Sequence, residues 1–381
     1  MSLANRITAE LKGDRVIWAI VAILAFISIL AVYSSTSYLA VAKEGGRTEF
    51  YLIKQILILG FGLLITYAFY LIHYKRFNQW APYLVIIMAP LLIFTLAFGV
   101  EINHARRWLE IPGIGLTFQT SDFAKIAIIT YVARSISAKQ DYITDFQSAF
   151  LPIIIPIILT CLLIAPSNLS TALVIFVTCM TMMFIGRVAA KYIFLLMFCG
   201  IVAFAGLIVV GKVIPGMVRV DTWVERLKDF SGNSDGEEEL QVQVSKMAIA
   251  NGGFIGRGPG NSTQKNFLPA AYTDYIYAVI LEEYGLFGGA FIMGLFILLF
   301  FRVVRLVTVG SKTFPAILAF GLTLILVIQA FANMAVAVDL VPVTGLSIPM
   351  VGHGGTSLLF SCITFGMILS VSKHIDTVKD S

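Results

Sequence analysis

Long apolar runs recur along most of the chain, and each is close to the ~20 residues that an α-helix needs to cross a bilayer. Hydrophobic residues make up 58% of the 381 positions and charged residues only 13%, against roughly 25% in soluble domains. A soluble globular enzyme is therefore excluded. We expect an all-α polytopic membrane protein, a single integral-membrane domain over residues 1–381, with about ten transmembrane helices. The predicted spans are residues 17–40, 52–72, 80–98, 118–137, 150–165, 169–185, 192–210, 275–301, 314–338 and 346–371.

The fourth run is unusually polar, but the distribution of basic residues indicates that it spans the membrane. With ten spans and a cytoplasmic start, most Lys and Arg residues fall in inner loops, as the positive-inside rule requires. The short outer loops then carry only Lys43, Arg47, Arg106 and Arg107. If the fourth run did not span, this bias would reverse. Both termini are therefore predicted to be cytoplasmic.

Net charge and cysteine usage exclude several other classes. A formal charge of +5 is better read loop by loop than as a nucleic-acid footprint, so we expect no nucleic-acid partner. The four cysteines lie inside apolar runs without C-x-x-C spacing, which argues against disulfides, zinc and thiol catalysis.

One long outer segment separates the seventh and eighth spans, at residues 215–274. Its acidic stretch SGNSDGEEEL, at 231–240, is typical of a flexible loop. Loops on a rigid scaffold often carry function, so this extracytoplasmic loop is where we expect the distinctive chemistry. The alternative is a mere connector.

Charged side chains at bilayer depth cost ~2.5–3.5 kcal/mol each on insertion scales, which makes them functional candidates. Asp122 and Lys125 are three residues apart, so they share a helix face within ion-pair reach. Their spacing alone leaves a structural salt bridge and a functional site equally open. Glu282 and Glu283 differ by about 100° around a helix, so we expect at least one of them to be an interhelical strut.

Residues 251–285 are the richest candidate site. Closely spaced glycines, together with Arg257 and Lys265, are compatible with binding an anion. Asp274 follows Thr273 immediately before an apolar run, where a carboxylate is favoured by the helix dipole. A simple helix cap would explain Asp274 as well.

Taken together, these motifs resemble the SEDS family of bacterial cell-wall polymerases, the FtsW/RodA group, over essentially the whole chain. Upstream, Arg107-Trp108 followed by QTSDFAK (119–125) is similar to the family's R-W…Q-P-S-E-(F/L)-x-K. The pattern G-x-G-x-G-x-S-x-Q-K…L-P…T-D-(F/Y)-I-(F/Y)-A…E-E-x-G is met by Gly256, Gly258, Gly260, Ser262, Gln264, Lys265, Leu268, Pro269, Thr273, Asp274, Tyr275, Ile276, Tyr277, Ala278, Glu282, Glu283 and Gly285.

The chain also departs from the family pattern. Thr120 replaces a proline, Asp122 replaces a glutamate, and Asn168 stands where the family's Q-P-D-L-G-T has its acid. Any role of that acid is therefore not carried over. The opening GDRVIW…LAVYSS resembles division-type members, the FtsW branch, more than elongation-type ones.

The resemblance implies a peptidoglycan glycosyltransferase of the bacterial cytoplasmic membrane that polymerises lipid II at the outer face and releases undecaprenyl diphosphate. It implies Asp274 as the catalytic residue and a class B penicillin-binding protein transpeptidase and other division proteins as partners, besides lipid II and membrane lipids. A divalent cation, Mg²⁺ or Mn²⁺, held partly by Asp274 or Asp122 is expected, and no organic cofactor. The alternatives are a flippase or transporter of lipid-linked precursors and a non-catalytic division scaffold. The predicted substrate-binding residues are Arg107, Asp122, Lys125, Ser262, Gln264, Lys265, Thr273 and Glu282.

Overall fold

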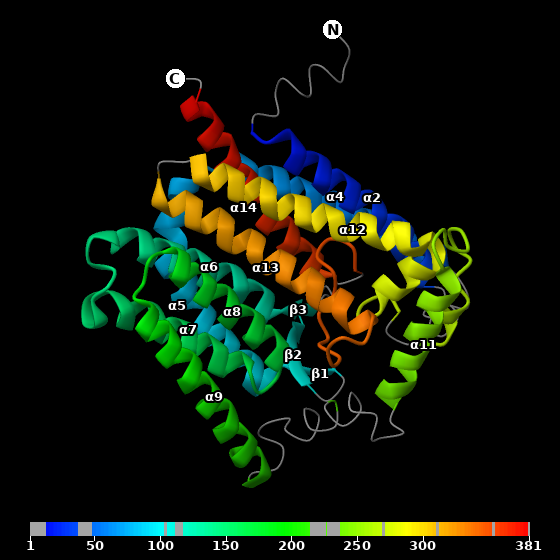
Figure 1. The fold of residues 1–381 in the computed structure, drawn as a ribbon, viewed down its shortest axis with the longest axis horizontal. Coiled ribbons are helices and arrows are strands. Elements are labelled where there is room, and N and C mark those ends of the chain that lie inside the picture. The colour runs from blue at the N-terminus through cyan, green and yellow to red at the C-terminus, as the bar shows by residue number, and fades with distance from the viewer. Residues whose placement is uncertain are drawn as a thin grey trace.

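A computed structural model describes residues 13–36, 48–102, 105–110, 117–213, 226, 237–268, 271–309, 312–352 and 355–379. In this part of the chain a helix occupies each of the ten predicted runs, which confirms the all-α polytopic fold (Figure 1). Those helices are α2 (Arg15–Ser35), α4 (Thr48–Leu71), α5 (Tyr74–Phe98), α6 (Thr120–Ala138), α7 (Leu151–Ile164), α8 (Leu169–Ile185), α9 (Ala190–Val213), α12 (Ile276–Val309), α13 (Thr313–Ala337) and α14 (Thr356–Lys379).

Seven helices of the described part are long and apolar enough to cross a membrane: α2, α4, α5, α7 with the turn before it, α12, α13 and α14. Helix α8 and the first part of α9 are shorter apolar helices. Helix α6 is not among the seven, because polar side chains occupy its first turns. It packs against α5, α8 and α13 instead of facing lipid, which explains how a polar run lies inside the bundle.

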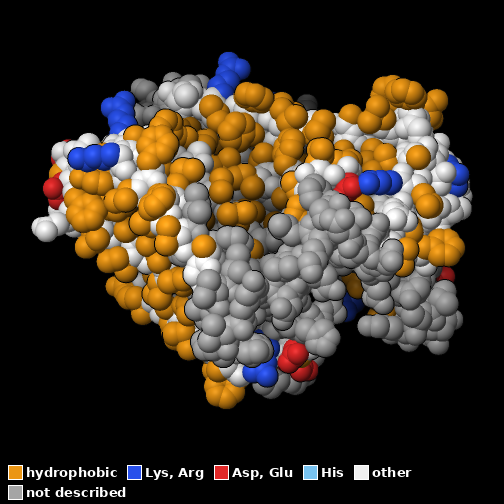
Figure 2. Space-filling model, turned by 60° about the horizontal axis from the view of Figure 1, so that its bottom comes forward, with side chains coloured by type: hydrophobic (Ala, Val, Ile, Leu, Met, Phe, Trp, Pro, Cys, Tyr) orange, Lys and Arg blue, Asp and Glu red, His pale blue; other side chains and the backbone are white. Residues whose placement is uncertain are grey.

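Helices α13 and α14 form the centre of the bundle, and α4 and α5 lie at its periphery. In the most apolar window of each helix, 78% of α13 and 72% of α14 is buried, against 22% of α4 and of α5. The peripheral helices expose large apolar side chains such as Leu57, Leu64 and Ile86. Figure 2 shows hydrophobic side chains over much of the sides of the molecule. Such a surface suits a lipid solvent rather than water.

Between α5 and α6 the chain forms a small antiparallel sheet that the sequence did not predict. Strands β1 (Val100–Ile102), β2 (Ala105–Glu110) and β3 (Thr117–Gln119) pair in the order β1-β2-β3. Trp108 lies opposite Gln119, so the two halves of the R-W…Q-T-S-D motif are cross-strand neighbours. Strands of three to six residues are too short to give a clear alternating pattern in the sequence.

Two predicted boundaries are wrong. The tenth span was expected from residue 346, but α14 begins at Thr356, and residues 338–352, hereafter the connecting segment, are not helical. Pro342 and Pro349 disfavour helix there, and Gly345 has a φ of 67°.

In the long outer segment, residues 237–240 were expected to be flexible but form the first turn of α11 (Glu237–Gly252). The rest of the acidic stretch, at 231–236, lies outside the described residues.

The eighth predicted span is not one continuous helix. Gly285 has φ 66° and ψ −169° inside α12, so the chain breaks there between residues 276–284 and 286–309. In Figure 1 the start of α2 and the end of α14 lie at one end of the bundle, whereas the sheet and α11 lie toward the other. Most of the predicted site residues belong to the end with the sheet.

Candidate functional site

The glycine-rich loop packs backbone to backbone against the break in α12. The N–H of Arg257 donates to the carbonyl oxygen of Glu282 (3.0 Å), and that of Gly258 donates to Glu283 (2.9 Å). A Cβ at Gly256 would lie 2.2 Å from the carbonyl oxygen of Glu283, and one at Gly285 would lie 2.5 Å from the nitrogen of Gly256. These two glycines are needed because two stretches of backbone touch at this point.

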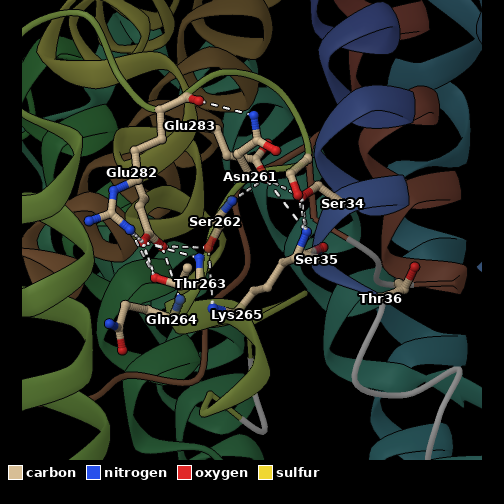
Figure 3. A network of polar contacts seen from close by, with 12 residues as sticks. Ser34, Ser35, Thr36, Asn261, Ser262, Thr263, Gln264, Lys265, Glu282 and Glu283 are labelled. Atoms are coloured by element: carbon tan, nitrogen blue, oxygen red, sulfur yellow. Dashed lines mark hydrogen bonds and ion pairs between the residues drawn. The ribbon is translucent and has the colours of Figure 1, made fainter.

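The carboxylate of Glu282 is the anion that this loop holds (Figure 3). It accepts hydrogen bonds from the Ser262 hydroxyl (2.5 Å), the Thr263 N–H (3.2 Å) and hydroxyl (3.0 Å), and the Gln264 N–H (3.2 Å). The guanidinium of Arg257 lies 3.7 Å away. Glu282 is fully buried, and these bonds satisfy its charge without a ligand.

A second carboxylate extends this network to the first helix. Lys265 is buried, and its ammonium donates to the Gly260 carbonyl (2.7 Å) and the Ser34 hydroxyl (3.2 Å) and lies 3.9 Å from Glu283. The Ser34 hydroxyl donates to Glu283 in turn. Ser262 contacts both glutamates, through its hydroxyl and its N–H. The network thus fastens the loop to α2, and both glutamates act as struts.

Asp274 lies in a turn of residues 271–275, directly before α12. Asn333 on α13 holds this turn: its amide nitrogen is 3.3 Å from the Thr273 carbonyl oxygen, 3.0 Å from that of Asp274 and 2.7 Å from that of Leu346. Asn333 is 1% exposed. The backbone of the catalytic candidate is therefore held in place by a side chain of α13.

The negative charge of the Asp274 carboxylate acts on the phenol of Tyr272. The pKa of this phenol is raised, first by burial, then by the negative charge of Asp274, and then by Tyr51 on α4. The phenol therefore stays protonated at neutral pH and lies close enough to Asp274 for the two to interact.

Asp122 and Lys125 form the ion pair that their spacing predicted, with Nζ 2.7 Å from Oδ1. The ammonium also donates to Oε1 of Gln329 (3.0 Å). Oδ2 of Asp122 is buried and has no hydrogen-bond partner. The pair lines a small cavity between α6, α13 and α14, with hydroxyls from Ser357, Ser361 and Thr364.

Arg107 lies on β2 beside a second cavity. Its Nε donates to the carbonyl oxygen of Ser167 (2.6 Å). This small cavity is also lined by Arg106, Thr120 and Ser121. Two arginines and the N-terminus of α6, which has no capping hydrogen bond from the Gln119 side chain, give it a positive character.

Three consecutive residues of the connecting segment bring these distant groups together. A Cβ at Gly345 would be 3.8 Å from an Arg107 guanidinium nitrogen. The carbonyl oxygen of Leu346 accepts a hydrogen bond from Asn333, which also holds the Asp274 turn. The carbonyl oxygen of Ser347 accepts a hydrogen bond of 3.0 Å from Gln329, whose side chain also binds Lys125.

The structure therefore brings Arg107, Asp122, Lys125, Thr273 and Asp274 around one segment. Ser262, Gln264, Lys265 and Glu282 belong to the adjoining loop network, and a direct role for them in substrate binding stays a prediction.

Sequence reasoning missed Gln329 and Asn333. Two amide side chains four residues apart in the apolar run 314–338 share one helix face. Polar residues in a span point to an interhelical contact or a site, and this was the signal available.

The described residues contain no group of three or more His, Cys, Asp or Glu side chains that forms a metal cage. Lys125 already neutralises one oxygen of Asp122, so that residue is a poor cation ligand. Asp274 fits only as a single ligand, with substrate phosphates supplying the remainder. The expected divalent cation stays a prediction.

The fold and site define a polytopic membrane protein with a charged site at one end of its helical bundle. Residues 14–377 match the family model for FtsW, RodA and SpoVE, described as "Cell cycle protein", and the chain belongs to this family. It is 34% identical over 368 residues to the probable peptidoglycan glycosyltransferase FtsW of Trichlorobacter lovleyi, covering 95% of this chain and 93% of that protein. It is 30% identical over 372 residues to stage V sporulation protein E of Bacillus subtilis, with 96% and 99% covered.

Two solved structures share the fold. One is a chain of a peptidoglycan synthase complex that coordinates polymerization and crosslinking, with a TM-score of 0.76, 22% identity, and 95% of this chain and 98% of that chain covered. The other is the rod shape determining protein RodA of Thermus thermophilus, with a TM-score of 0.68, 21% identity and coverage of 96% and 98%.

Proposed function

We propose that the protein is a peptidoglycan glycosyltransferase of the division-type branch, which polymerises lipid II at the end of the bundle that carries the sheet. The observation that carries the proposal is the convergence of Arg107, the Asp122–Lys125 pair and the Asp274 turn on residues 345–347. A carboxylate and cations at one end of an apolar helical bundle suit a substrate that joins a sugar, a diphosphate and an isoprenoid chain.

In this reaction the hydroxyl oxygen of the acceptor sugar bonds to the anomeric carbon of the donor. The bond from that carbon to the diphosphate oxygen breaks, and undecaprenyl diphosphate leaves. Asp274 takes the hydroxyl proton on its carboxylate as general base. Arg107 stabilises the negative charge that develops on the diphosphate.

The remaining site residues have supporting roles in the proposal. Oδ2 of Asp122 accepts a hydrogen bond from the substrate, and Lys125 holds the other oxygen of that carboxylate. The loop network of Glu282, Ser262 and Lys265 holds the break in α12, and the part of α12 before this break, residues 276–284, follows the Asp274 turn.

The membrane placement and partners follow from the same proposal. The chain lies in the bacterial cytoplasmic membrane, with both termini in the cytoplasm and the sheet on the outer side, where polymerised glycan is needed. A class B penicillin-binding protein crosslinks the strands. The likeness to a chain of a synthase complex supports a partner of this kind.

The purified protein, with a candidate partner, should convert lipid II into glycan polymer that is resolved on a gel, with a divalent cation supplied. If no polymer forms but vesicles containing the protein move lipid II between leaflets, the flippase alternative is correct.

Two adjacent arginines provide a matched test of the diphosphate site. Arg107→Gln should weaken lipid II binding about tenfold, since it removes a charge-assisted contact worth about 1.4 kcal/mol or more. Arg106→Gln should have a clearly smaller effect, because that guanidinium, although it lines the same cavity, is half-exposed and pairs with Glu101 at 3.7 Å. Binding is measured by fluorescence anisotropy of labelled lipid II. Equal effects of the two substitutions would make Arg107 an ordinary loop charge.

A further inference from the structure

Basic side chains gather at the end of the bundle where α2 begins and α14 ends, opposite the Asp274 turn. They are His73, between α4 and α5, Lys75 in the first turn of α5, Lys312 just before α13, and Lys373 and His374 on α14. We call these five residues the basic cluster. The rings of His73 and His374 have centroids 4.0 Å apart, so the packing of three separate parts of the chain creates the cluster.

The charges of the cluster disfavour one another. Burial lowers the pKa of His73, and the other four members of the cluster lower it further. Within the described residues, Lys75 and Lys312 belong to no ion pair. Asp14, a carboxylate packed against α14 at this end, is already bonded to Arg302 and caps α2. An anion would relieve this repulsion.

The donors of the cluster suit the oxygens of a phosphate. Nδ1 of His73 accepts the backbone N–H of Lys75 (3.2 Å), so the neutral ring carries its hydrogen on Nε2, as a donor. The ammonium of Lys312 lies 3.2 Å from the hydroxyl of Tyr74, and Lys75 and Lys312 are both exposed. Neutral and cationic donors therefore face solvent at one place.

The neighbouring surface favours a lipid over a soluble anion. Leu64, Tyr67 and Leu71 of α4 are 68%, 47% and 54% exposed, and their spacing places them on one helix face. That apolar stripe runs toward His73, which follows the end of α4. Tyr67 belongs to this stripe, and tyrosines are frequent at the headgroup level of membranes. The Lys373 ammonium lies 4.5 Å from the ring centroid of the buried Tyr70.

We infer that the basic cluster binds the phosphate of an anionic phospholipid, with the acyl chains along the apolar stripe of α4. Basic pockets between transmembrane helices recognise such headgroups. The site is separate from the polymerisation site, so the inference does not depend on the proposed function.

The test compares two double variants of equal charge in nanodiscs of phosphatidylcholine with dioleoyl-phosphatidylglycerol. Binding of the anionic lipid is measured by native mass spectrometry of protein released from the nanodiscs. Lys75→Gln with Lys312→Gln should lower affinity about 25-fold, since each lysine contributes roughly 1 kcal/mol, or about fivefold. The control is Lys139→Gln with Lys191→Gln. Lys191 also stacks on a tyrosine, Tyr192, but neither lysine belongs to the cluster.

Equal losses in the two double variants would overturn the inference, because they would reflect the general charge of this face. The melting temperature of the detergent-solubilised protein is also measured with phosphatidylglycerol and with inorganic phosphate. If inorganic phosphate raises it as much as the lipid does, the inference is overturned in favour of a soluble anion. Lys312→Arg keeps the charge and should retain affinity. Both lysines are exposed, so the variants should melt, without added lipid, within a few degrees of the wild type.

Discussion

One amide group on α13 fixes the position of the residue proposed as the base. Asn333 donates to carbonyls of the Asp274 turn and to the connecting segment, while its own Oδ1 is buried without a hydrogen-bond partner. An unmade bond of this kind costs about 1–3 kcal/mol, so the arrangement is held by the surrounding packing. The side chain of Asn333 thus holds the turn that carries Asp274.

Replacing Asp274 with Asn separates chemistry from structure. Asn has nearly the same size and leaves the backbone bonds of the turn to Asn333 intact. Loss of a general base typically lowers rate by ~10²–10⁴-fold, so we expect polymer to fall below detection while expression and melting in detergent stay near normal. The readout is the glycan gel beside a melting curve. Substantial residual polymer would refute the catalytic assignment.

Asn333→Asp removes both N–H donors and places a negative charge beside three carbonyl oxygens. A displaced Asp274 turn should lower kcat about 10²-fold, since misplacement by ~1 Å has this effect, with little change in KM for lipid II. Thr323→Val is the matched control, because this buried α13 hydroxyl lacks a hydrogen-bond partner and should be dispensable. A fall in activity that merely follows the melting temperature in both variants would make Asn333 structural.

At the scale of elements, the break in α12 and the glycine-rich loop form one unit. Leu286 N–H donates to the Gly253 carbonyl (2.9 Å), and Phe287 N–H donates to that of Phe254 (3.3 Å). The loop therefore supplies hydrogen-bond acceptors to the helix that restarts after Gly285, while Glu282 accepts bonds from the loop in return. Neither part keeps its conformation without the other.

Gly285→Ala should disrupt this unit. A Cβ there would lie 2.3 Å from the Phe254 carbonyl oxygen, and its φ of 66° costs a non-glycine residue about 1–3 kcal/mol. We expect a lower melting temperature and loss of polymerisation together. Gly294→Ala, in the same helix, meets nothing within 4 Å and should be neutral or slightly stabilising. Similar melting of both variants would show that the break tolerates a side chain.

For the whole molecule, the two ends of the bundle have different tasks. The end with the sheet carries the proposed polymerisation site, and the opposite end carries the basic cluster. This division requires the two ends to face opposite sides of the membrane, as the distribution of basic residues predicts.

Cysteine labelling checks that orientation. In a variant lacking the four native cysteines, a cysteine at Asn261, exposed in the glycine-rich loop, should react with an impermeant thiol reagent added outside cells. One at Asp141, exposed after α6, should react only after permeabilisation. Labelling of both from the same side would contradict the ten-span topology, while reversed labelling would invert its orientation.

The sequence by itself determined the class of fold, because a run of apolar residues either reaches across a bilayer or does not. It also indicated the ion pair of Asp122 and Lys125, since i,i+3 spacing places both on one face. Short-range regularity was sufficient in both cases. The family motifs likewise identified the Asp274 region, since their residues are consecutive in the chain.

Only the tertiary structure decided how the candidate site residues are brought together in space. Asn333 and Gln329 hold groups that lie far away in the sequence, through carbonyls of Leu346 and Ser347, which the sequence had assigned to the start of the tenth span. The break at Gly285 depends on backbone contacts between residues up to 33 apart, and the use of Glu282 as the loop's own anion depends on side-chain contacts between residues 18 to 20 apart. Such contacts have no local period. They form where packing places two segments in contact, and for that reason no pattern along the chain predicted them.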